Sequence, residues 1–280
     1  MIELINQHLQ QLLEPLNPGL VKEAMTYSLL APGKRLRPML MLKALQANGI
    51  DYTKYVDEAC AIEMVHCYSL IHDDLPAMDN DDLRRGRPTC HKQFDEATAI
   101  LAGDALLTHA FTVLSNSQVL TDYQKVRCIQ ILSSFAGQNG MIYGQQQDLY
   151  FENKKATLEE LKDVHLHKTG KLIQAPLMMA AVIINEAEID QYQKLGEHIG
   201  IAFQIQDDLL DVLGDTAKLG KKVGSDMENN KSTYVTLFGV DKCKELIKEY
   251  FEEAFADLYS LQINHGILLE VLEKLIKRDY

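Results

Sequence analysis

Two groups of aspartates, far apart in the chain, have the residue types and spacing of a divalent-metal site. They consist of Asp73, Asp74 and Asp79 in the first half of the chain and of Asp207, Asp208 and Asp211 in the second. Carboxylates this close repel one another unless a cation lies between them. Hard oxygen ligands suit Mg²⁺, which keeps several waters and bridges carboxylates to substrate phosphates. The sequence therefore predicts a magnesium site for a phosphorylated substrate.

The second group lies on a predicted amphipathic helix. Asp207 and Asp211 are four residues apart and share a face, and Gln204 lies on that face just before Asp207. Ile205 and Leu209 face the other way and belong to the predicted core. Because like charges in the middle of such a helix are locally unfavourable, we expect a compensating interaction elsewhere.

The first group lies at the end of a predicted helix. Pro76 cannot continue a regular helix, because its ring clashes with the preceding turn. The helix should therefore end near Leu75, and the loop that follows can bring Asp79 back toward Asp73.

Basic residues follow both aspartate groups. Arg84 and Arg85 come after the first group, and Lys221 and Lys222 come after the second. Arginine suits multidentate recognition of phosphate. Either group alone could be a solvated acidic helix end. Two such groups, each followed by cations and embedded in apolar helices, favour the metal–phosphate interpretation.

A basic turn precedes another predicted helix. Lys34, Arg35 and Arg37 lie between Pro32 and Pro38. Backbone N–H groups and the positive end of a helix favour an anion at such a position. The alternative is a solvated basic turn.

Three single residues near these motifs each have two interpretations. His66 lies two turns before Asp73 and can donate to a phosphate, or it is a buried histidine with a partner of its own. Lys168 interrupts a long helix and can reach an anion, or it lies on an exposed basic face. Tyr68 lies about 7.5 Å deeper along the helix than Asp73, so it is either the floor of an apolar pocket or plain core.

Helical periodicity dominates the rest of the chain. The predicted helices span residues 3–15, 20–31, 37–48, 55–75, 94–114, 121–143, 158–185, 189–213, 231–238 and 241–258. Alternating apolar and polar runs bounded by Asn-Gly or Asp-Gly turns are missing, so no sheet is predicted. No linker or change of composition divides the chain. We therefore expect one all-α domain over residues 1–280 with a large central bundle.

The composition is that of an ordinary globular protein, with 46% hydrophobic and 24% charged residues. A net charge of −12 opposes binding to nucleic acid but allows a small anionic substrate in a locally basic cleft. The five scattered cysteines are predicted to be free thiols in a reducing compartment. The N-terminus does not resemble a signal peptide, and no apolar run reaches the ~18 residues of a membrane span. We expect a cytoplasmic protein without membrane insertion.

Several longer stretches resemble the trans-type prenyl diphosphate synthases, and within that family the bacterial-type farnesyl diphosphate synthases. The matching stretches are GKRLRP (33–38), YSLIHDDLPAMDNDDLRRGRPTCH (68–91), ILAGDALL (100–107), HKTG (167–170), FQIQDDLLDVLGD (203–215) and NKSTY (230–234). The resemblance implies an isoprenoid-synthase-like helical bundle around a deep central cavity, in a homodimer. It also implies an Mg²⁺-dependent prenyltransferase that condenses isopentenyl diphosphate with dimethylallyl or geranyl diphosphate to farnesyl diphosphate, releasing diphosphate.

The resemblance further implies a role for each matching residue. The metal ligands would be Asp73, Asp74, Asp79, Asp207, Asp208 and Asp211, holding three Mg²⁺ ions, or Mn²⁺ in their place. The allylic diphosphate would be bound by Arg84, Lys168, Lys231 and either Lys221 or Lys222. The isopentenyl diphosphate site would consist of Gly33, Lys34, Arg37, His66 and Arg85. Thr169 and Gln204 would line the carbocation and complete a catalytic set with Asp73, Asp79, Asp207 and Lys168. Ala31-Pro32 departs from the family pattern, which puts the conformation of that loop in question.

Product length depends on the floor of the cavity. The resemblance to farnesyl makers includes an aromatic residue five positions before the first aspartate, here Tyr68, with Ser69 beside it. It also includes a two-residue insertion within the first motif. Geranylgeranyl synthases share the insertion but have a smaller residue at the floor, so a geranylgeranyl or geranyl product is the alternative within the family.

Other classes fit less well. A terpene cyclase binds one diphosphate and does not need the second basic site of Lys34, Arg37 and Arg85. A metal-dependent phosphohydrolase that used His72 and Asp73 would need further histidine ligands. A non-catalytic helical binding protein would have no need of both aspartate groups.

Overall fold

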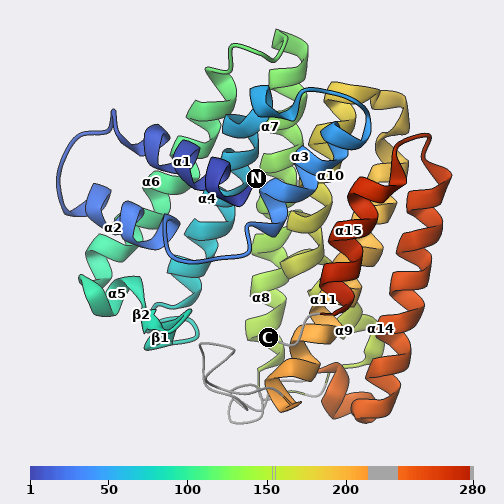
Figure 1. Ribbon diagram of the computed structural model, residues 1–280. Coiled ribbons are helices and arrows are strands. Elements are labelled where there is room, and N and C mark those ends of the chain that lie inside the picture. Colours follow the sequence, from blue (N-terminus) through green and yellow to red (C-terminus); the bar gives the residue numbers. More distant parts are fainter. Residues whose placement is uncertain (153, 155, 214–232, 278–280) are drawn as a thin grey trace.

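The computed structural model describes residues 1–152, 154, 156–213 and 233–277, and these are almost entirely helical, which confirms the all-α prediction (Figure 1). The α-helices are α1 (Ile2–Leu13), α2 (Leu20–Leu29), α3 (Leu36–Ala47), α4 (Val56–Asp73), α5 (Cys90–Gln93), α6 (Glu96–Ser115), α7 (Asp122–Ala136), α8 (Met141–Phe151), α9 (Leu158–His165), α10 (Lys171–Ile184), α11 (Ile189–Leu213), α14 (Tyr234–Ser260) and α15 (His265–Ile276). Shorter elements are the 3-10 helices η1 (Tyr52–Tyr55) and η3 (Glu186–Glu188), the π-helix η2 (Leu166–Gly170), and the strands β1 (Leu83–Arg84) and β2 (Arg87–Pro88).

Helix α4 is the centre of the bundle. It packs against α1, α2, α3, α6 and α10, and most of its side chains are buried. A helix that is buried on most sides needs mostly apolar residues, and seven of the ten residues from Val56 to Val65 are apolar. Glu63 is a buried exception, and it pairs with Arg35. Helix α11 packs against α10 and α14 on another side of the molecule. The core thus positions two long helices that each end in aspartates.

The only sheet among the described residues is the hairpin of β1 and β2 that follows α4. Arg85 and Gly86 both have positive φ values, 55° and 72°, which suits a tight two-residue hairpin turn. The hairpin is fixed to α2, because the Tyr27 hydroxyl donates to the carbonyl oxygen of Pro88 at 2.8 Å. The guanidinium of Arg87 also lies 4.2 Å from the centroid of the Tyr27 ring.

The prediction of one helix over 121–143 is wrong at its C-terminal end. The chain breaks after Ala136, and a separate helix, α8, begins at Met141 and continues to Phe151. Gly137 and Gly140 lie in the break. A Cβ on Gly140 would overlap the backbone of Phe135, so this turn needs glycine. The break turns α8 toward the end of the bundle that carries the aspartates.

Two further boundaries differ from the expectation. The stretch predicted as one helix over 158–185 contains the π-helix η2 between α9 and α10. The helix α15 was not among the predicted helices. The apolar residues of α15 at helical spacing, Leu268, Leu272 and Leu275, are buried and were its signal in the sequence. The predicted break before residue 241 is confirmed, because Gly239 inside α14 has non-helical angles (φ 76°, ψ 169°).

Helix α6 is the one helix among the described residues that is long and apolar enough to cross a membrane. Its mean hydropathy is 1.5, yet only 44% of this stretch is buried. It packs against α4 and α2 within the bundle, so it serves as a core helix on one side.

The five cysteines are all free thiols, as predicted, and all of them are buried.

The C-terminal ends of α4 and α11 point to the same end of the molecule, the lower end in Figure 1. The β1–β2 hairpin and the lower part of α8 lie at that end too. The fold therefore places both aspartate-bearing helix ends at one end of the bundle.

Candidate active site

The first aspartate group lies where α4 ends. The helix ends at Asp73, two residues before the expected end, and Asp74 is its C-cap. The backbone N–H of Asp79 donates to the carbonyl oxygen of Asp73 at 2.9 Å. The loop therefore returns to the helix end, as the sequence predicts. Burial raises the pKa of Asp73, and the charge of Lys168 opposes that shift.

Asp74, the next residue, is bound by an arginine. It is 3% exposed, and its Oδ1 accepts hydrogen bonds from Arg84 Nε at 2.8 Å and from Arg84 Nη2. Burial raises the pKa of Asp74 to about 6, against the effect of Arg84. The first motif thus divides into Asp73 at the helix end and Asp74 in an ion pair.

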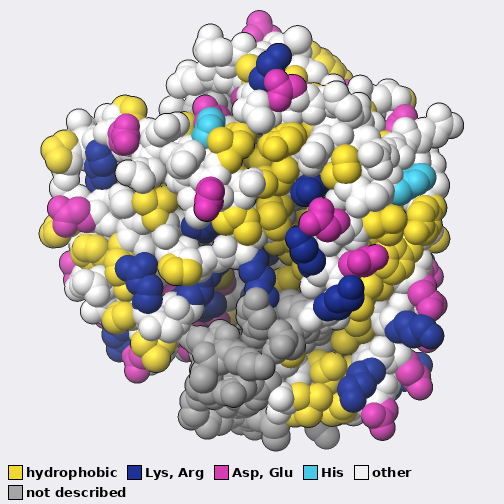
Figure 2. Space-filling view, in the orientation of Figure 1, with side chains coloured by type: hydrophobic (Ala, Val, Ile, Leu, Met, Phe, Trp, Pro, Cys, Tyr) yellow, Lys and Arg dark blue, Asp and Glu magenta, His cyan; other side chains and the backbone are white. Residues whose placement is uncertain are grey.

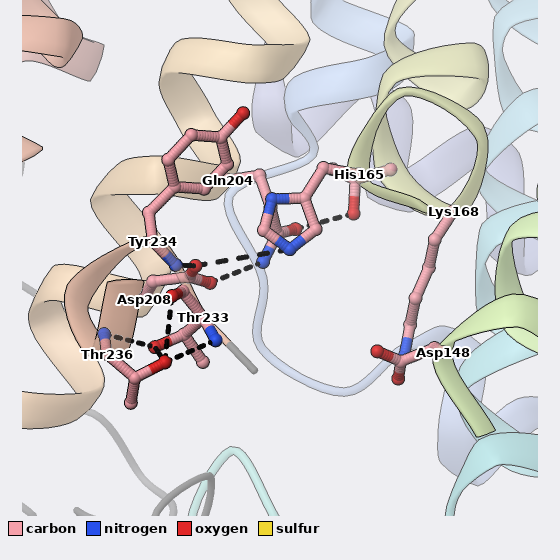
Figure 3. Close-up of polar contacts among 9 residues, drawn as sticks. Asp148, His165, Lys168, Gln204, Asp208, Thr233, Tyr234 and Thr236 are labelled. Atoms are coloured by element: carbon pink, nitrogen blue, oxygen red, sulfur yellow. Dashed lines mark hydrogen bonds and ion pairs between the residues drawn. The ribbon is translucent and has the colours of Figure 1, made fainter. Parts of the chain in front are cut away.

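In the second group, Asp208 is bound by neighbouring polar groups, as Figure 3 shows. Asp208 is 4% exposed and accepts from Gln204 Nε2 at 3.1 Å and from the backbone N–H of Tyr234 at 3.0 Å. The oxygen of the Gln204 amide accepts from the Thr169 hydroxyl at 2.6 Å. His165 Nε2 lies 4.0 Å from Asp208 Oδ2. Burial raises the pKa of Asp208 to about 7.

Helix α8 adds a residue that the sequence reasoning missed. Asp148 Oδ2 accepts a hydrogen bond from Lys168 Nζ at 2.6 Å (Figure 3). Burial alone would lower the pKa of Lys168, but Asp148 and Asp73 outweigh it and raise that pKa. The charge of Asp148 also raises the pKa of both Asp73 and Asp208. Asp148 therefore lies within electrostatic reach of both aspartate groups.

The contact between Asp148 and Lys168 forms because α8 packs closely against the π-helix η2. A Cβ on Gly144 would overlap the backbone of Lys168, so glycine is needed there. Gln145, the next residue, is 9% exposed, and neither atom of its amide has a hydrogen-bond partner among the described residues. It lines the cavity described below. The signal in the sequence was the polar run 145–148 within an apolar helical pattern.

The basic turn and the hairpin meet beside the first group. Arg85 Nη1 donates to the carbonyl oxygen of Pro32 at 3.0 Å. A Cβ on Gly33 would overlap the Arg85 guanidinium, so this residue leaves room for the arginine. Lys34 is exposed on the same turn.

Arg35, by contrast, is directed into the protein. It is 3% exposed and its Nη1 lies 2.9 Å from Glu63 Oε1. The cations of this turn are therefore of two kinds, because Arg35 stabilises the fold while Lys34 and Arg37 lie outside that ion pair.

Arg37 and His66 complete this basic region. Burial lowers the pKa of Arg37 to about 10, and the nearby charges of Glu63 and Asp207 oppose that shift. Arg37 Nε is buried without a hydrogen-bond partner among the described residues. Burial and the charges of Arg37 and Arg85 together hold the pKa of His66 well below its usual value. Unpaired buried donors of this kind suit an anion.

A cavity of about 500 Å³ connects these regions. Predicted site residues along it are Arg37, His66, Tyr68, Ser69, Asp73, Lys168 and Thr169. Its other walls are mostly apolar and include Leu107, Met141, Ile142, Leu149 and Leu172. Arg84 and Arg85 line a neighbouring cavity that shares His66 with this one. Figure 2 shows Lys and Arg side chains around a hollow near the centre of the face.

Not every predicted residue can be placed. Lys221, Lys222 and Lys231 lie outside the described residues. Within the described part of the chain, no group of three His, Cys, Asp or Glu side chains is close enough to hold a metal ion by itself. An ion here would need ligands from a substrate or from water, which is how Mg²⁺ is usually bound.

Comparisons with known proteins show which family the chain is similar to. A model of the family described as polyprenyl synthetase matches residues 18–262. A farnesyl diphosphate synthase of Micrococcus luteus is 46% identical over 280 residues, covering 99% of this chain and 96% of its own length. A chloroplastic heterodimeric geranylgeranyl pyrophosphate synthase large subunit of Arabidopsis thaliana is 42% identical, covering 90% of this chain and 70% of its own.

Among solved structures, the geranyltransferase of Helicobacter pylori complexed with magnesium and isoprenyl diphosphate has a similar fold. Its TM-score to this chain is 0.85 at 37% sequence identity, with 97% of this chain and 93% of that chain covered.

Proposed function

This chain belongs to the polyprenyl synthetase family, and from that premise we infer that it is a prenyltransferase of the farnesyl diphosphate synthase type. It condenses isopentenyl diphosphate with dimethylallyl or geranyl diphosphate to give (2E,6E)-farnesyl diphosphate and releases diphosphate. The observation that carries this assignment is one cavity that is lined by Asp73 and Lys168 and also by Tyr68 and several apolar side chains. A substrate with a charged head and an apolar tail matches both parts.

The metal site is the first part of the proposal. The donor set fits Mg²⁺, because all six predicted ligands are carboxylates, which lie at the end of α4, in the loop after it and on α11. Asp148 lies within electrostatic reach of Asp73 and Asp208. Asp73, Asp79, Asp207 and Asp211 would contact the ions. Asp74 and Asp208 would contribute indirectly, because they accept hydrogen bonds from Arg84 and Gln204 and so orient these side chains. Three bound Mg²⁺ ions, the number that the family resemblance implies, would stabilise the departing diphosphate.

Cationic side chains would hold the allylic diphosphate beside the metal site. Lys168 lies among Asp148, Asp73 and Asp79, so it keeps its charge at neutral pH. Arg84 is held by Asp74. Both can donate to phosphate oxygens, and Lys221, Lys222 and Lys231 remain proposed members of this set.

Thr169 and Gln204 would stabilise the allylic cation. The Thr169 hydroxyl donates its proton to the Gln204 oxygen, which leaves the lone pairs of the threonine oxygen available. Neutral oxygen dipoles of this kind can stabilise positive charge without attacking it. The apolar walls exclude water, which would otherwise quench the cation.

Isopentenyl diphosphate would bind at the basic turn. Arg37 and His66 line the cavity of about 500 Å³, and Arg85 lines the neighbouring cavity, which shares His66. Gly33 and Lys34 lie on the turn that Arg85 contacts. A second diphosphate there would give the unpaired Arg37 Nε an acceptor. Two substrates held together supply much of the rate acceleration.

Tyr68 and Ser69 would limit product length. Both line the cavity, and Tyr68 is 5% exposed. A growing chain that meets this aromatic ring would stop at fifteen carbons. A longer, geranylgeranyl product is the alternative that an assay separates.

The assembly and location complete the proposal. We propose a homodimer through α6, an apolar helix whose Ile100 and Leu101 are 44% and 53% exposed.

A single domain over residues 1–280 is supported by a core that includes both Ile5 and Leu275. The cytoplasm is the proposed location, because the buried thiols suit a reducing compartment.

The experiment is incubation with radiolabelled isopentenyl diphosphate, geranyl diphosphate and Mg²⁺, followed by chromatography of the lipid product. We expect farnesyl diphosphate. Asp73→Ala and Asp207→Ala should each lower kcat about 10²-fold or more, because each removes a carboxylate of the metal site.

Asp190→Ala is the matched control, because Asp190 is an exposed aspartate at the start of α11. Its turnover should equal that of the unsubstituted protein, and circular dichroism should show the same helix content in all variants. Near-normal turnover of either site variant would refute the metal assignment.

A further inference from the structure

The ring of Tyr68 has no polar anchor. Its hydroxyl is buried and has no hydrogen-bond partner among the described residues. Burial raises the pKa of Tyr68 to about 12, so the hydroxyl stays neutral. The orientation of the ring therefore depends on what packs against it.

His72 packs against it from the same face of α4, one turn further on. The two ring centroids are 5.8 Å apart with an angle of 81° between the planes, which is the edge-to-face arrangement that aromatic rings prefer. His72 also lines the same cavity as Tyr68. It is thus a neighbour of both the tyrosine and the space that the product tail would fill.

His72 is itself fixed by α6. Its Nε2 donates to the carbonyl oxygen of Ile100 at 3.0 Å, and Asp104 Oδ1 lies 3.9 Å from the same nitrogen. A Cβ on Gly103 would overlap the imidazole, so α6 has glycine where the ring rests. The imidazole of His72 therefore lies between α4 and α6, where it donates a hydrogen bond to Ile100 and packs against Gly103.

We propose that His72 is a positioning residue for product length, which acts by bracing the ring of Tyr68 against α6. This proposal rests on the proposed function. In this proposal, residues of both α4 and α6 limit the product length. Tyr68 contacts the product tail, and His72, which packs against Gly103, prevents the tyrosine side chain from rotating. Tyr68 without this brace can rotate and admit a longer chain.

The test uses the full-length enzyme and measures the lengths of the products. His72→Ala removes the brace, and His72→Leu removes it while filling part of its volume to protect the fold. With Tyr68 intact, both variants should raise the ratio of twenty-carbon to fifteen-carbon product about tenfold, the size of effect that a small change in an apolar pocket produces. Tyr68→Ala should give the same direction of change, and His72→Ala should add nothing to it.

The matched control is His109→Ala. His109 lies on α6 and also donates from Nε2 to a backbone carbonyl, that of Leu12 at 3.0 Å, but it lines a different groove. Its product profile should stay that of the unsubstituted enzyme.

Unchanged product lengths in a folded His72→Leu or His72→Ala variant would overturn the proposal. So would further lengthening by His72→Ala in the Tyr68→Ala background, because His72 would then act independently of Tyr68. If the unsubstituted chain makes no prenyl product at all, the proposed function fails instead, so the two failures are distinguishable.

Discussion

At the scale of single residues, neighbouring aspartates of each motif have different surroundings. Successive side chains on a helix point about 100° apart, so two adjacent carboxylates cannot both face one cavity. In the adjacent pairs Asp73–Asp74 and Asp207–Asp208, Asp74 and Asp208 are the buried members, and buried carboxylates need partners. Arg84 supplies the partner for Asp74, and Gln204 with the Tyr234 backbone supplies it for Asp208. Each buried aspartate therefore orients a residue that we propose to be functional.

Asp208→Asn tests this division. Asparagine keeps the size but has one acceptor oxygen, so it cannot accept from both Gln204 and Tyr234. We expect kcat to fall about 10–100-fold, as for other residues that orient functional groups, with the Mg²⁺ concentration for half-maximal activity unchanged. Steady-state kinetics over a Mg²⁺ titration measures both quantities.

Asp207→Asn is the comparison for that titration, because the same change at the neighbouring residue should raise the Mg²⁺ requirement. Recovery of Asp208→Asn activity by excess Mg²⁺ would contradict the positioning role and make Asp208 a direct ligand.

At the scale of elements, the site depends on short segments that pack closely. The β1–β2 hairpin contacts α2 through Tyr27, and its turn contacts the basic turn through Arg85 and Pro32. On the other side, Gly144 lets α8 approach the π-turn η2 and brings Asp148 to Lys168. Helix ends supply the aspartates, and these two close contacts supply the cations around them.

Gly33→Ala tests the contact between the basic turn and the hairpin. The added methyl would overlap the guanidinium of Arg85 and displace it. Loss of one charge-assisted hydrogen bond to the substrate should raise the KM for isopentenyl diphosphate about tenfold, with a much smaller change in kcat. Initial rates at saturating allylic substrate give both constants.

Gly266→Ala is the control for this change, because Gly266 is an exposed residue of α15 with only an ordinary contact to Asn264. It should leave both KM values unchanged. An unaltered KM in Gly33→Ala would remove the basic turn from the isopentenyl diphosphate site.

At the scale of the whole molecule, α6 has more apolar surface than the bundle covers. Less than half of its apolar stretch is buried, and Ile100 and Leu101 remain on the surface. Leu101 also lines a groove of about 830 Å³ between α6 and the connection of α1 to α2. Apolar surface of this kind on a protein often marks an interface. A second copy of the chain is the partner that we propose.

Leu101→Asp should turn the dimer into a monomer at micromolar concentration, because it places a charge in the proposed apolar contact. Size-exclusion chromatography with light scattering measures the mass directly. Leu158→Asp is the control, since Leu158 is 45% exposed on α9, away from α6. A dimer that persists in Leu101→Asp would move the interface elsewhere.

Local sequence determined much of this protein. The helical class, the end of α4 before Pro76 and the return of Asp79 to Asp73 all follow from patterns within a few turns of chain. Such features depend on neighbouring residues, so they can be read directly from the sequence. The spacing of both aspartate motifs belongs here too.

Only the tertiary structure decided which of the paired residues face the cavity. Arg35 pairs with Glu63 and Asp74 with Arg84, and Asp148 joins the site from a part of α8 that lies beyond the end of the helix predicted over 121–143. These outcomes depend on long-range packing, because a buried charge settles wherever the fold brings it a partner. The sequence contains the charged residues, but their division into structural and functional members arises only when distant helices meet.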